Sequence, residues 1–162
     1  MADTAQYVTL GVAGEILAAP VERVQEILEM RPISRLPHAP AYFLGMIDVR
    51  GLGVPVIDLR VRLGFPAADD TTNTRIIVLR VTIGGRELTL GLKADRVFEV
   101  TVLDAVGLEP PPEIGVQWRS ESILGIGRRN GAFVTVLDLN HLFAATEITL
   151  IGAGTAAADA AA

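Results

Sequence analysis

The chain has 162 residues, of which 50% are apolar, 14 are basic and 19 are acidic, so its net charge at neutral pH is -5. This length suits one domain, or two small lobes that share a core. The acidic balance argues against a nucleic-acid duplex as partner, because such a partner requires a basic surface. The absence of cysteine excludes disulfides, thiolate zinc sites and cysteine nucleophiles.

The two ends of the sequence predict where the protein resides and where order stops. No basic residue precedes Arg23, although a secretory signal requires one, and no apolar run reaches the roughly 18 residues of a membrane span. We therefore expect a cytoplasmic protein. The Gly- and Ala-rich stretch from Gly152 to Ala162 has little to bury, so a disordered tail is expected there.

Short runs rich in Val, Ile and Leu recur along the chain, for example at Tyr7 to Val12, Ile76 to Ile83 and Phe133 to Leu137. Several of these runs alternate in polarity, and turn residues separate them about every eight to twelve residues. This pattern is typical of a small β-barrel or sandwich with little helix. Only short helical turns are expected, one of them starting at Pro40 and stopping at Gly45.

The segment V-E-R-V-Q-E-I-L places Val21, Val24, Ile27 and Leu28 at helical spacing. Two interpretations of these side chains remain open. Either they pack in the core, or Val24 and Ile27 line a seam and stay partly exposed for a partner.

A hairpin is predicted from Gly45 to Leu59, with Arg50-Gly51 between its two apolar runs. Tight hairpin turns favour Asn, Asp or Gly, because their residues need a positive φ. If the backbone at Arg50 is left-handed, the arginine costs on the order of 1–2 kcal/mol there. Arg50 is therefore a candidate functional residue, unless it simply lies in a relaxed, exposed loop.

The sequence repeats itself internally. Residues 42–59 align with residues 122–139 without a gap, which places Asn130-Gly131 opposite Arg50-Gly51, and R-V-Q-E-I from Arg23 matches R-V-F-E-V from Arg96. The repeat predicts two lobes of about 65 residues, one at about 7–65 and one at about 75–143, with the polar stretch 66–74 as linker. Such small lobes should pack together over a shared core, with a groove at their seam.

Few residues suggest chemistry. Asp58 and Asp138 each follow a strand and precede a short apolar segment, so we interpret them as helix N-caps and not as a general acid and base. His38 and His141 have no second histidine at ligand spacing, so no metal site is expected. No phosphate loop or nucleophile elbow is present, and an enzyme is poorly supported.

The motifs together resemble the CheW family. G-M-I-D-V-R-G-L-G-V-P-V-I-D-L-R, starting at Gly45, is similar to the family pattern G-x-x-N-x-R-G-x-x-x-P-x-x-D-L-R. P-V-E-R-V-Q-E-I, L-P-H-A-P-A-Y-F-L-G, R-V-F-E-V and the proline run 110–112 also look like family features, so that the resemblance covers 6–147. Asp48 departs from the pattern, which usually has Asn there; it would either pair with Arg50 or influence the choice of receptor.

The resemblance implies a mostly β fold: two SH3-like five-stranded β-barrel lobes packed over a shared hydrophobic core, with few short helices. It also implies a non-enzymatic adaptor, without cofactor or metal, that bridges methyl-accepting chemoreceptors to the histidine kinase CheA. The receptor's helical hairpin tip would dock between the barrels. The receptor-binding residues would be Arg50, Val24, Ile27 and Val97.

Further implications concern structure and partners. Gly45 would be structural and precede the strand, and Gly51 would serve the turn. The regulatory domain of CheA, itself CheW-like, would pair with this chain barrel to barrel, and other CheW-like domains in an array are further expected partners.

Two alternatives remain open at this point. One is a catalytic or ligand-binding barrel with its site in the same groove, which would require convergent titratable groups. The other is a CheW-like paralogue that serves a non-motility pathway, or that competes for receptor and kinase sites without activating the kinase.

Overall fold

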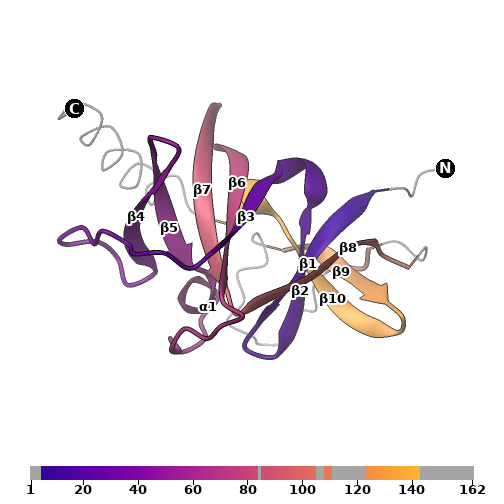
Figure 1. Cartoon of the computed structure of the whole chain (residues 1–162). Coiled ribbons are helices and arrows are strands. Elements are labelled where there is room, and N and C mark those ends of the chain that lie inside the picture. Colours follow the sequence, from indigo (N-terminus) through magenta and orange to yellow (C-terminus); the bar gives the residue numbers. More distant parts are fainter. Residues whose placement is uncertain (1–4, 84, 105–107, 111–122, 143–162) are drawn as a thin grey trace.

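The structure is a computed structural model, and it describes residues 5–83, 85–104, 108–110 and 123–142. Its strands form two five-stranded sheets, ordered β8-β1-β2-β10-β9 and β3-β6-β7-β5-β4 (Figure 1). The strands are β1 (Gln6–Val12), β2 (Glu15–Pro20), β3 (Val24–Glu29), β4 (Phe43–Val49), β5 (Leu52–Asp58), β6 (Arg75–Ile83), β7 (Arg86–Ala94), β8 (Arg96–Val102), β9 (Ile123–Arg129) and β10 (Ala132–Leu137). The helical elements are η1 (Val21–Arg23), α1 (Leu59–Arg62) and η3 (Leu139–His141).

The predicted mostly β architecture, with two five-stranded SH3-like lobes and few short helices, is confirmed. The expected closure into barrels is not seen as a hydrogen-bonded ring: within the described residues, β8 and β9 end one sheet and β3 and β4 end the other. Each lobe is therefore a sheet with two edge strands, and the edges at β4 and β9 are each covered in part by an isolated bridge, Ser34 with Met46 and Glu109 with Ile126.

The two lobes are not the two halves of the chain, which corrects the predicted boundaries 7–65 and 75–143. The sheet containing β3 to β7 is continuous in sequence, and we call it the central lobe. The other sheet combines β1 and β2 with β8, β9 and β10, and we call it the terminal lobe. Figure 1 shows the central lobe on the left and the terminal lobe on the right.

The internal repeat is visible in the sheet order. The strands β3, β5 and β4 of the central lobe are repeated as β8, β10 and β9 of the terminal lobe, five strands later in the chain. The strands β6 and β7 occupy the places in the central lobe that β1 and β2 occupy in the terminal lobe. Both sheets also have one parallel pair at the same place, β5 with β7 and β10 with β2. The first hairpin of each repeat thus belongs to the sheet of the other repeat. Sequence similarity alone does not reveal this exchange, because both hairpins present the same apolar pattern to either sheet.

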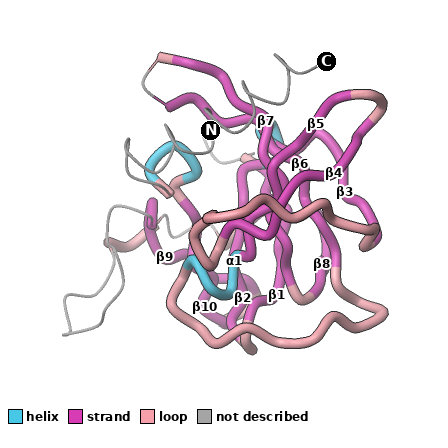
Figure 2. The backbone as a smooth tube through the Cα atoms, turned by 90° about the vertical axis from the view of Figure 1, so that its left-hand side faces the viewer, coloured by secondary structure: helices cyan, strands magenta, loops and turns pink. Residues whose placement is uncertain are grey.

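The stretch 66–74 does not join the lobes. It connects α1 to β6, and both of these elements belong to the central lobe. The chain passes between the lobes elsewhere, through η1 between β2 and β3, and through the single residue Asp95 between β7 and β8. Figure 2 shows α1 near β1, β2 and β10 of the terminal lobe, and its residue Arg60 contacts Asp95 at the second of these crossings.

One large core cluster is shared by both lobes. Its buried side chains come from β1, β2, η3 and the end of β10 in the terminal lobe and from β5, β6 and β7 in the central lobe, among other places. Each lobe also has a smaller cluster, built on Ile47, Val54 and Ile76 in the central lobe and on Val134 and Val136 in the terminal lobe. The shared cluster holds the two small sheets together, because neither sheet buries enough apolar area alone.

The segment 21–28 is not a helix, although its apolar spacing suggested one. Only Val21–Arg23 form a 3-10 turn, and Val24–Glu29 form β3, an edge strand paired with β6. A β-bulge between Val24 and Glu26 shifts the register of β3. Helical spacing in so short a segment is ambiguous, and pairing with β6 decides in favour of a strand.

Several expectations fall outside the described residues. These are the tail from Gly152 to Ala162, most of the proline-containing loop near residue 110, and the end of the second repeat beyond residue 142.

Candidate functional site

Arg50 and Gly51 form a two-residue turn between β4 and β5. Their φ angles are 54° and 83°, so both residues are left-handed, as a type I′ hairpin turn requires. The alternative of a relaxed four-residue loop is excluded, because β4 ends at Val49 and β5 begins at Leu52. A left-handed arginine costs on the order of 1–2 kcal/mol relative to glycine or asparagine, so local folding does not explain the choice of arginine.

The Arg50 side chain is directed at β3. Its Nη1 lies 2.8 Å from Oε2 of Glu26, and the two side chains are 77% and 22% exposed. Four of the five guanidinium donors remain for other partners, since this ion pair uses one of them. The Glu26 carboxylate thus orients an otherwise solvent-exposed cation beside the edge strand β3.

Asp48 does not pair with Arg50, which was one of the expected possibilities. Its Oδ1 accepts a hydrogen bond of 2.7 Å from the Gly51 N–H, and its carbonyl oxygen accepts one of 3.0 Å from Arg31 Nη1. Asp48 therefore stabilises the turn on which Arg50 stands. An asparagine side chain also offers an oxygen acceptor, so the family's usual residue could make the same contact.

The apolar residues expected at the receptor surface divide into two kinds. Val24 and Val97 are half-buried and pack against the shared core cluster, whereas Ile27 is 40% exposed. Val24 opens β3 directly after the η1 crossing, and Val97 follows Asp95 by two residues on β8. The two valines therefore lie where the chain passes between the lobes, on the edge strands of different sheets.

Gly45 lies inside β4 and not before the strand, which corrects the sequence-based expectation. Its φ is 140°, and a Cβ added there would collide with the backbone carbonyl of Ser34. Ser34 and Met46 exchange two backbone hydrogen bonds, both of 2.8 Å. Gly45 thus allows the preceding segment to approach β4 closely.

Asp58 and Asp138 stand at equivalent positions but act differently. Asp58 is buried at the N-terminus of α1, and its Oδ1 accepts a hydrogen bond of 3.0 Å from the Arg60 N–H. Asp138 occupies the N-cap position of η3, but its side chain accepts no capping hydrogen bond from a backbone N–H. Its Oδ2 instead lies 2.9 Å from Nδ1 of His141.

Sequence reasoning missed Glu26 and the outer face of β8. Glu26 lies in the repeated motif R-V-Q-E-I, and the second copy repeats it as Glu99, so the repeat itself was a signal. On β8, the side chains of Phe98, Val100 and Val102 are 48%, 51% and 39% exposed. Their apolar character was readable from the sequence, but their exposure was not, because it depends on the position of β8 as an edge strand.

The described residues hold no group of three or more His, Cys, Asp or Glu side chains that could bind a metal ion. In the same part of the chain, no helix has the length and apolar character required to cross a membrane. The described geometry offers three separate features for contacts: the exposed Arg50 oriented by Glu26, the exposed Ile27 on β3, and the exposed apolar side chains on β8.

Comparisons with known proteins agree with this description. The family model described as CheW-like domain matches residues 6–147. A probable chemotaxis protein CheW of Rhizobium etli is 38% identical over 76% of this chain and 77% of its own length, and the chemotaxis protein CheW of Bacillus subtilis is 33% identical over 80% of each chain.

A solved structure shows the same likeness in three dimensions. The scaffolding protein TtCheW of Thermoanaerobacter tengcongensis superposes with a TM-score of 0.76 at 28% identity, over 88% of this chain and 90% of that one. A family match over nearly the whole described chain, relatives above 30% identity and a common fold lead to one conclusion: the chain belongs to the CheW-like family.

Proposed function

We propose that this protein is a non-enzymatic adaptor that couples methyl-accepting chemoreceptors to the histidine kinase CheA, in the cytoplasm at membrane receptor arrays. Membership of the CheW-like family and the chemotaxis names of its relatives support this role. The related structure from Thermoanaerobacter tengcongensis is described as a scaffolding protein, which is the same class of function.

The observation that carries the proposal is the Arg50 turn. Arg50 stands in a left-handed position that glycine or asparagine would adopt at lower cost, and its largely exposed guanidinium is oriented by Glu26. Guanidinium donors suit the carboxylates and carbonyls of a helical hairpin tip. The exposed Ile27 follows Glu26 on β3, so its side chain offers an apolar contact on the opposite face of the strand from the Glu26–Arg50 pair.

The receptor surface in this proposal consists of Arg50, Val24 and Ile27 from the central lobe and Val97 from the terminal lobe. The helical receptor tip would lie in a groove at the boundary between the two lobes. The regulatory domain of CheA would pair with the lobes barrel to barrel, and further CheW-like domains would join in the same way.

Reconstitution with a chemoreceptor cytoplasmic hairpin fragment and a CheA kinase from the same organism tests the proposal. We expect the wild-type chain to form the ternary complex and to raise kinase autophosphorylation. Arg50→Ala should weaken receptor binding roughly 10- to 150-fold, as the loss of a charge-assisted contact worth about 1.5–3 kcal/mol implies. Asn130→Ala, at the equivalent turn of the terminal lobe, is the matched control and should bind as the wild type does.

The outcomes separate the alternatives. Absence of binding by the wild-type chain to both partners contradicts the adaptor role. Binding to both partners without any rise in autophosphorylation favours the competing paralogue. Undiminished coupling by Arg50→Ala removes Arg50 from the receptor surface.

A further inference from the structure

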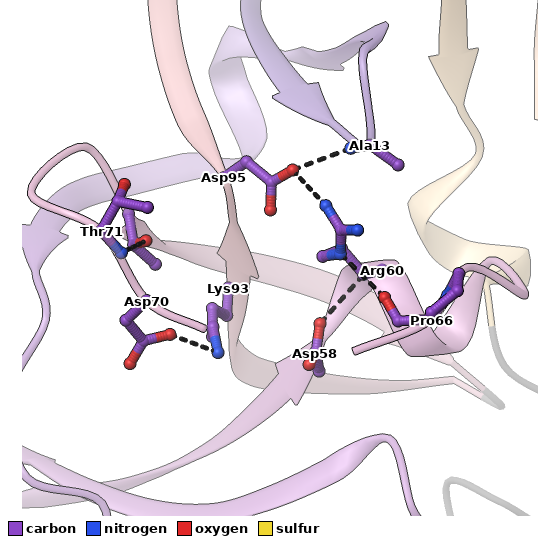
Figure 3. A network of polar contacts seen from close by, with 9 residues as sticks. Ala13, Asp58, Arg60, Pro66, Asp70, Thr71, Lys93 and Asp95 are labelled. Atoms are coloured by element: carbon purple, nitrogen blue, oxygen red, sulfur yellow. Dashed lines mark hydrogen bonds and ion pairs between the residues drawn. The ribbon is translucent and has the colours of Figure 1, made fainter. Parts of the chain in front are cut away.

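A charged contact joins the two lobes at one of the crossings. Arg60 belongs to α1 in the central lobe, and its Nη1 lies 2.6 Å from Oδ2 of Asp95. The same Oδ2 accepts a hydrogen bond of 2.8 Å from the N–H of Ala13, in the β1–β2 turn of the terminal lobe (Figure 3). One carboxylate oxygen is therefore shared by both lobes. We call these three residues the interlobe bridge.

The interlobe bridge is held in place by its surroundings. Arg60 Nε donates a hydrogen bond of 2.9 Å to the carbonyl oxygen of Pro66, and the Asp95 N–H donates one of 3.0 Å to the carbonyl oxygen of Gly11. The side chains of Arg60 and Asp95 are 17% and 35% exposed. A partly desolvated ion pair with fixed donors on both sides has a well-defined geometry, unlike a fully exposed pair.

Asp95 lies close in the chain to Val97, one of the residues of the proposed receptor surface. Asp95 is the single residue between β7 of the central lobe and β8 of the terminal lobe. Val97 follows two residues later, whereas Val24 and Ile27 lie on β3 of the central lobe. The carboxylate that contacts both lobes therefore lies directly before β8, the strand that carries Val97.

The internal repeat provides a second hydrogen bond between the lobes, this time from β6 of the central lobe to η3 of the terminal lobe. Asn140 follows Arg60 by 80 residues and lies in η3 of the terminal lobe. Its Oδ1 accepts a hydrogen bond of 3.0 Å from the N–H of Thr82 on β6 of the central lobe. Asn140 in η3 thus contacts β6 directly, whereas Arg60 in α1 is linked to the β1–β2 turn through an ion pair with Asp95.

A neighbouring ion pair provides an internal comparison. Lys93 Nζ lies 2.5 Å from Oδ1 of Asp70, and their side chains are 13% and 45% exposed. This ion pair resembles Arg60–Asp95 in its N–O distance and in the burial of its basic side chain, and Lys93 lies two residues before Asp95 (Figure 3). Both of its residues belong to the central lobe, so its loss should leave the relative position of the lobes unchanged.

We propose that the interlobe bridge positions β8 relative to β3, and that it thereby aligns the two halves of the partner-binding surface. Arg60 and Asp95 are positioning residues: they act through the strands and do not contact the partner. The binding consequence rests on the proposed adaptor function, whereas the geometric consequence concerns the protein alone.

The geometric part can be tested on the full chain without a partner. Because the sequence contains no cysteine, Leu52→Cys and Phe133→Cys place two unique spin labels, at side chains that are 53% and 62% exposed in different lobes. Pulsed dipolar spectroscopy then measures the distance distribution between the labels. Arg60→Ala and Asp95→Ala should broaden or shift the distribution, and Asp70→Asn should leave it as in the parent.

The binding part uses the chemoreceptor hairpin fragment as the probe. Arg60→Ala and Asp95→Ala should weaken its binding by about 2- to 30-fold, the range of substitutions that act at a distance. Asp95→Asn keeps an acceptor for the Ala13 N–H and should lose less affinity than Asp95→Ala, whereas Asp70→Asn should lose none. If Arg60→Ala fails to fold, Asp95→Asn, which removes the charge of the bridge but keeps an acceptor for the Ala13 N–H, serves in its place.

The outcomes are distinguishable. Unchanged label distances in folded Arg60→Ala and Asp95→Ala overturn the bridge. Changed distances with parental affinity overturn its role in aligning the binding surface. If the parent itself does not bind the receptor fragment, the adaptor function fails, while the distances still decide whether the bridge positions the lobes.

Discussion

The β4–β5 turn of the central lobe and the β9–β10 turn of the terminal lobe have nearly the same backbone but different side chains. Arg50 and Gly51 have φ angles of 54° and 83°, and Asn130 and Gly131 have 52° and 84°. The terminal-lobe turn carries the residue that a left-handed position favours, and the central-lobe turn does not. Because the backbone is common to both, the difference points to a role of Arg50 outside folding.

The hydrogen bonds that an aspartate accepts from each turn also differ in length. Asp48, on the strand that leads into the turn, accepts a hydrogen bond from Gly51 N–H at 2.7 Å. In the terminal lobe, Asp104 accepts longer contacts of 3.3 Å from the N–H of Asn130 and 3.5 Å from that of Gly131. The turn with the unfavourable residue thus has the shorter stabilising contact, as expected where local strain is offset by neighbours.

The largest expected difference between the lobes concerns the repeated glycine. Gly45→Ala should lower the free energy of unfolding by about 3–5 kcal/mol, because the new Cβ meets the Ser34 carbonyl and φ is 140°. Gly125→Ala should cost less, about 1–2 kcal/mol, because its Cβ would meet Leu108 Cβ at 2.8 Å and the Glu109 carbonyl oxygen at 3.0 Å, less severe overlaps than at Gly45, and its φ is not positive. Urea unfolding measures both values. Equal losses would show that the close approach at Gly45 is not a special constraint.

Exchanging the turn residues separates folding from binding. Arg50→Asn should raise the free energy of unfolding by about 0.5–1 kcal/mol, since the relief of a strain of about 1–2 kcal/mol outweighs the loss of one exposed ion pair. The same variant should bind the receptor fragment at least about 10-fold more weakly. Asn130→Arg should lose stability and keep its affinity. Urea titration and equilibrium binding test both halves, and a less stable Arg50→Asn would refute the strain argument.

The two capping aspartates should differ in their contribution to stability. Asp58→Ala removes a buried carboxylate that accepts the Arg60 N–H, and should cost about 1–2 kcal/mol. Asp138→Ala removes only the exposed contact with His141 and should cost less than about 0.5 kcal/mol. Thermal unfolding at neutral pH compares them. A similar loss in both variants would mean that the contact with the helix N-terminus is not what matters at Asp58.

The smallest difference is expected at the repeated glutamates. Glu26→Gln weakens a 2.8 Å ion pair with Arg50, whereas Glu99 lies 3.9 Å from Arg129. Glu26→Gln should reduce receptor affinity about 1.4- to 5-fold, the range of an ion pair of about 0.2–1 kcal/mol, and Glu99→Gln should have no measurable effect. In the Arg50→Ala background, Glu26→Gln should have no further effect. An additive loss there would show that Glu26 acts independently of Arg50.

Much of this structure was predictable because the determining signals are local. The strands 6–12, 75–83 and 132–137 agree with their apolar runs to within a residue. The Asn130-Gly131 and Arg50-Gly51 turns follow from turn chemistry together with the alignment of the repeats. The amphipathic stretch after Val21 was misinterpreted because six residues are too few to distinguish helical from strand spacing once a bulge intervenes.

The sequence by itself determined the repeat, its turns, its apolar strands and the anomaly at Arg50, since each of these depends on residues that are close in the chain. Tertiary structure alone decided which hairpin joins which sheet, which placed Glu26 beside Arg50 and Asp95 between Arg60 and Ala13. The physical reason is that two similar repeats offer two nearly equivalent pairings. The choice between them depends on the very short crossings at η1 and Asp95 and on the core shared by both lobes.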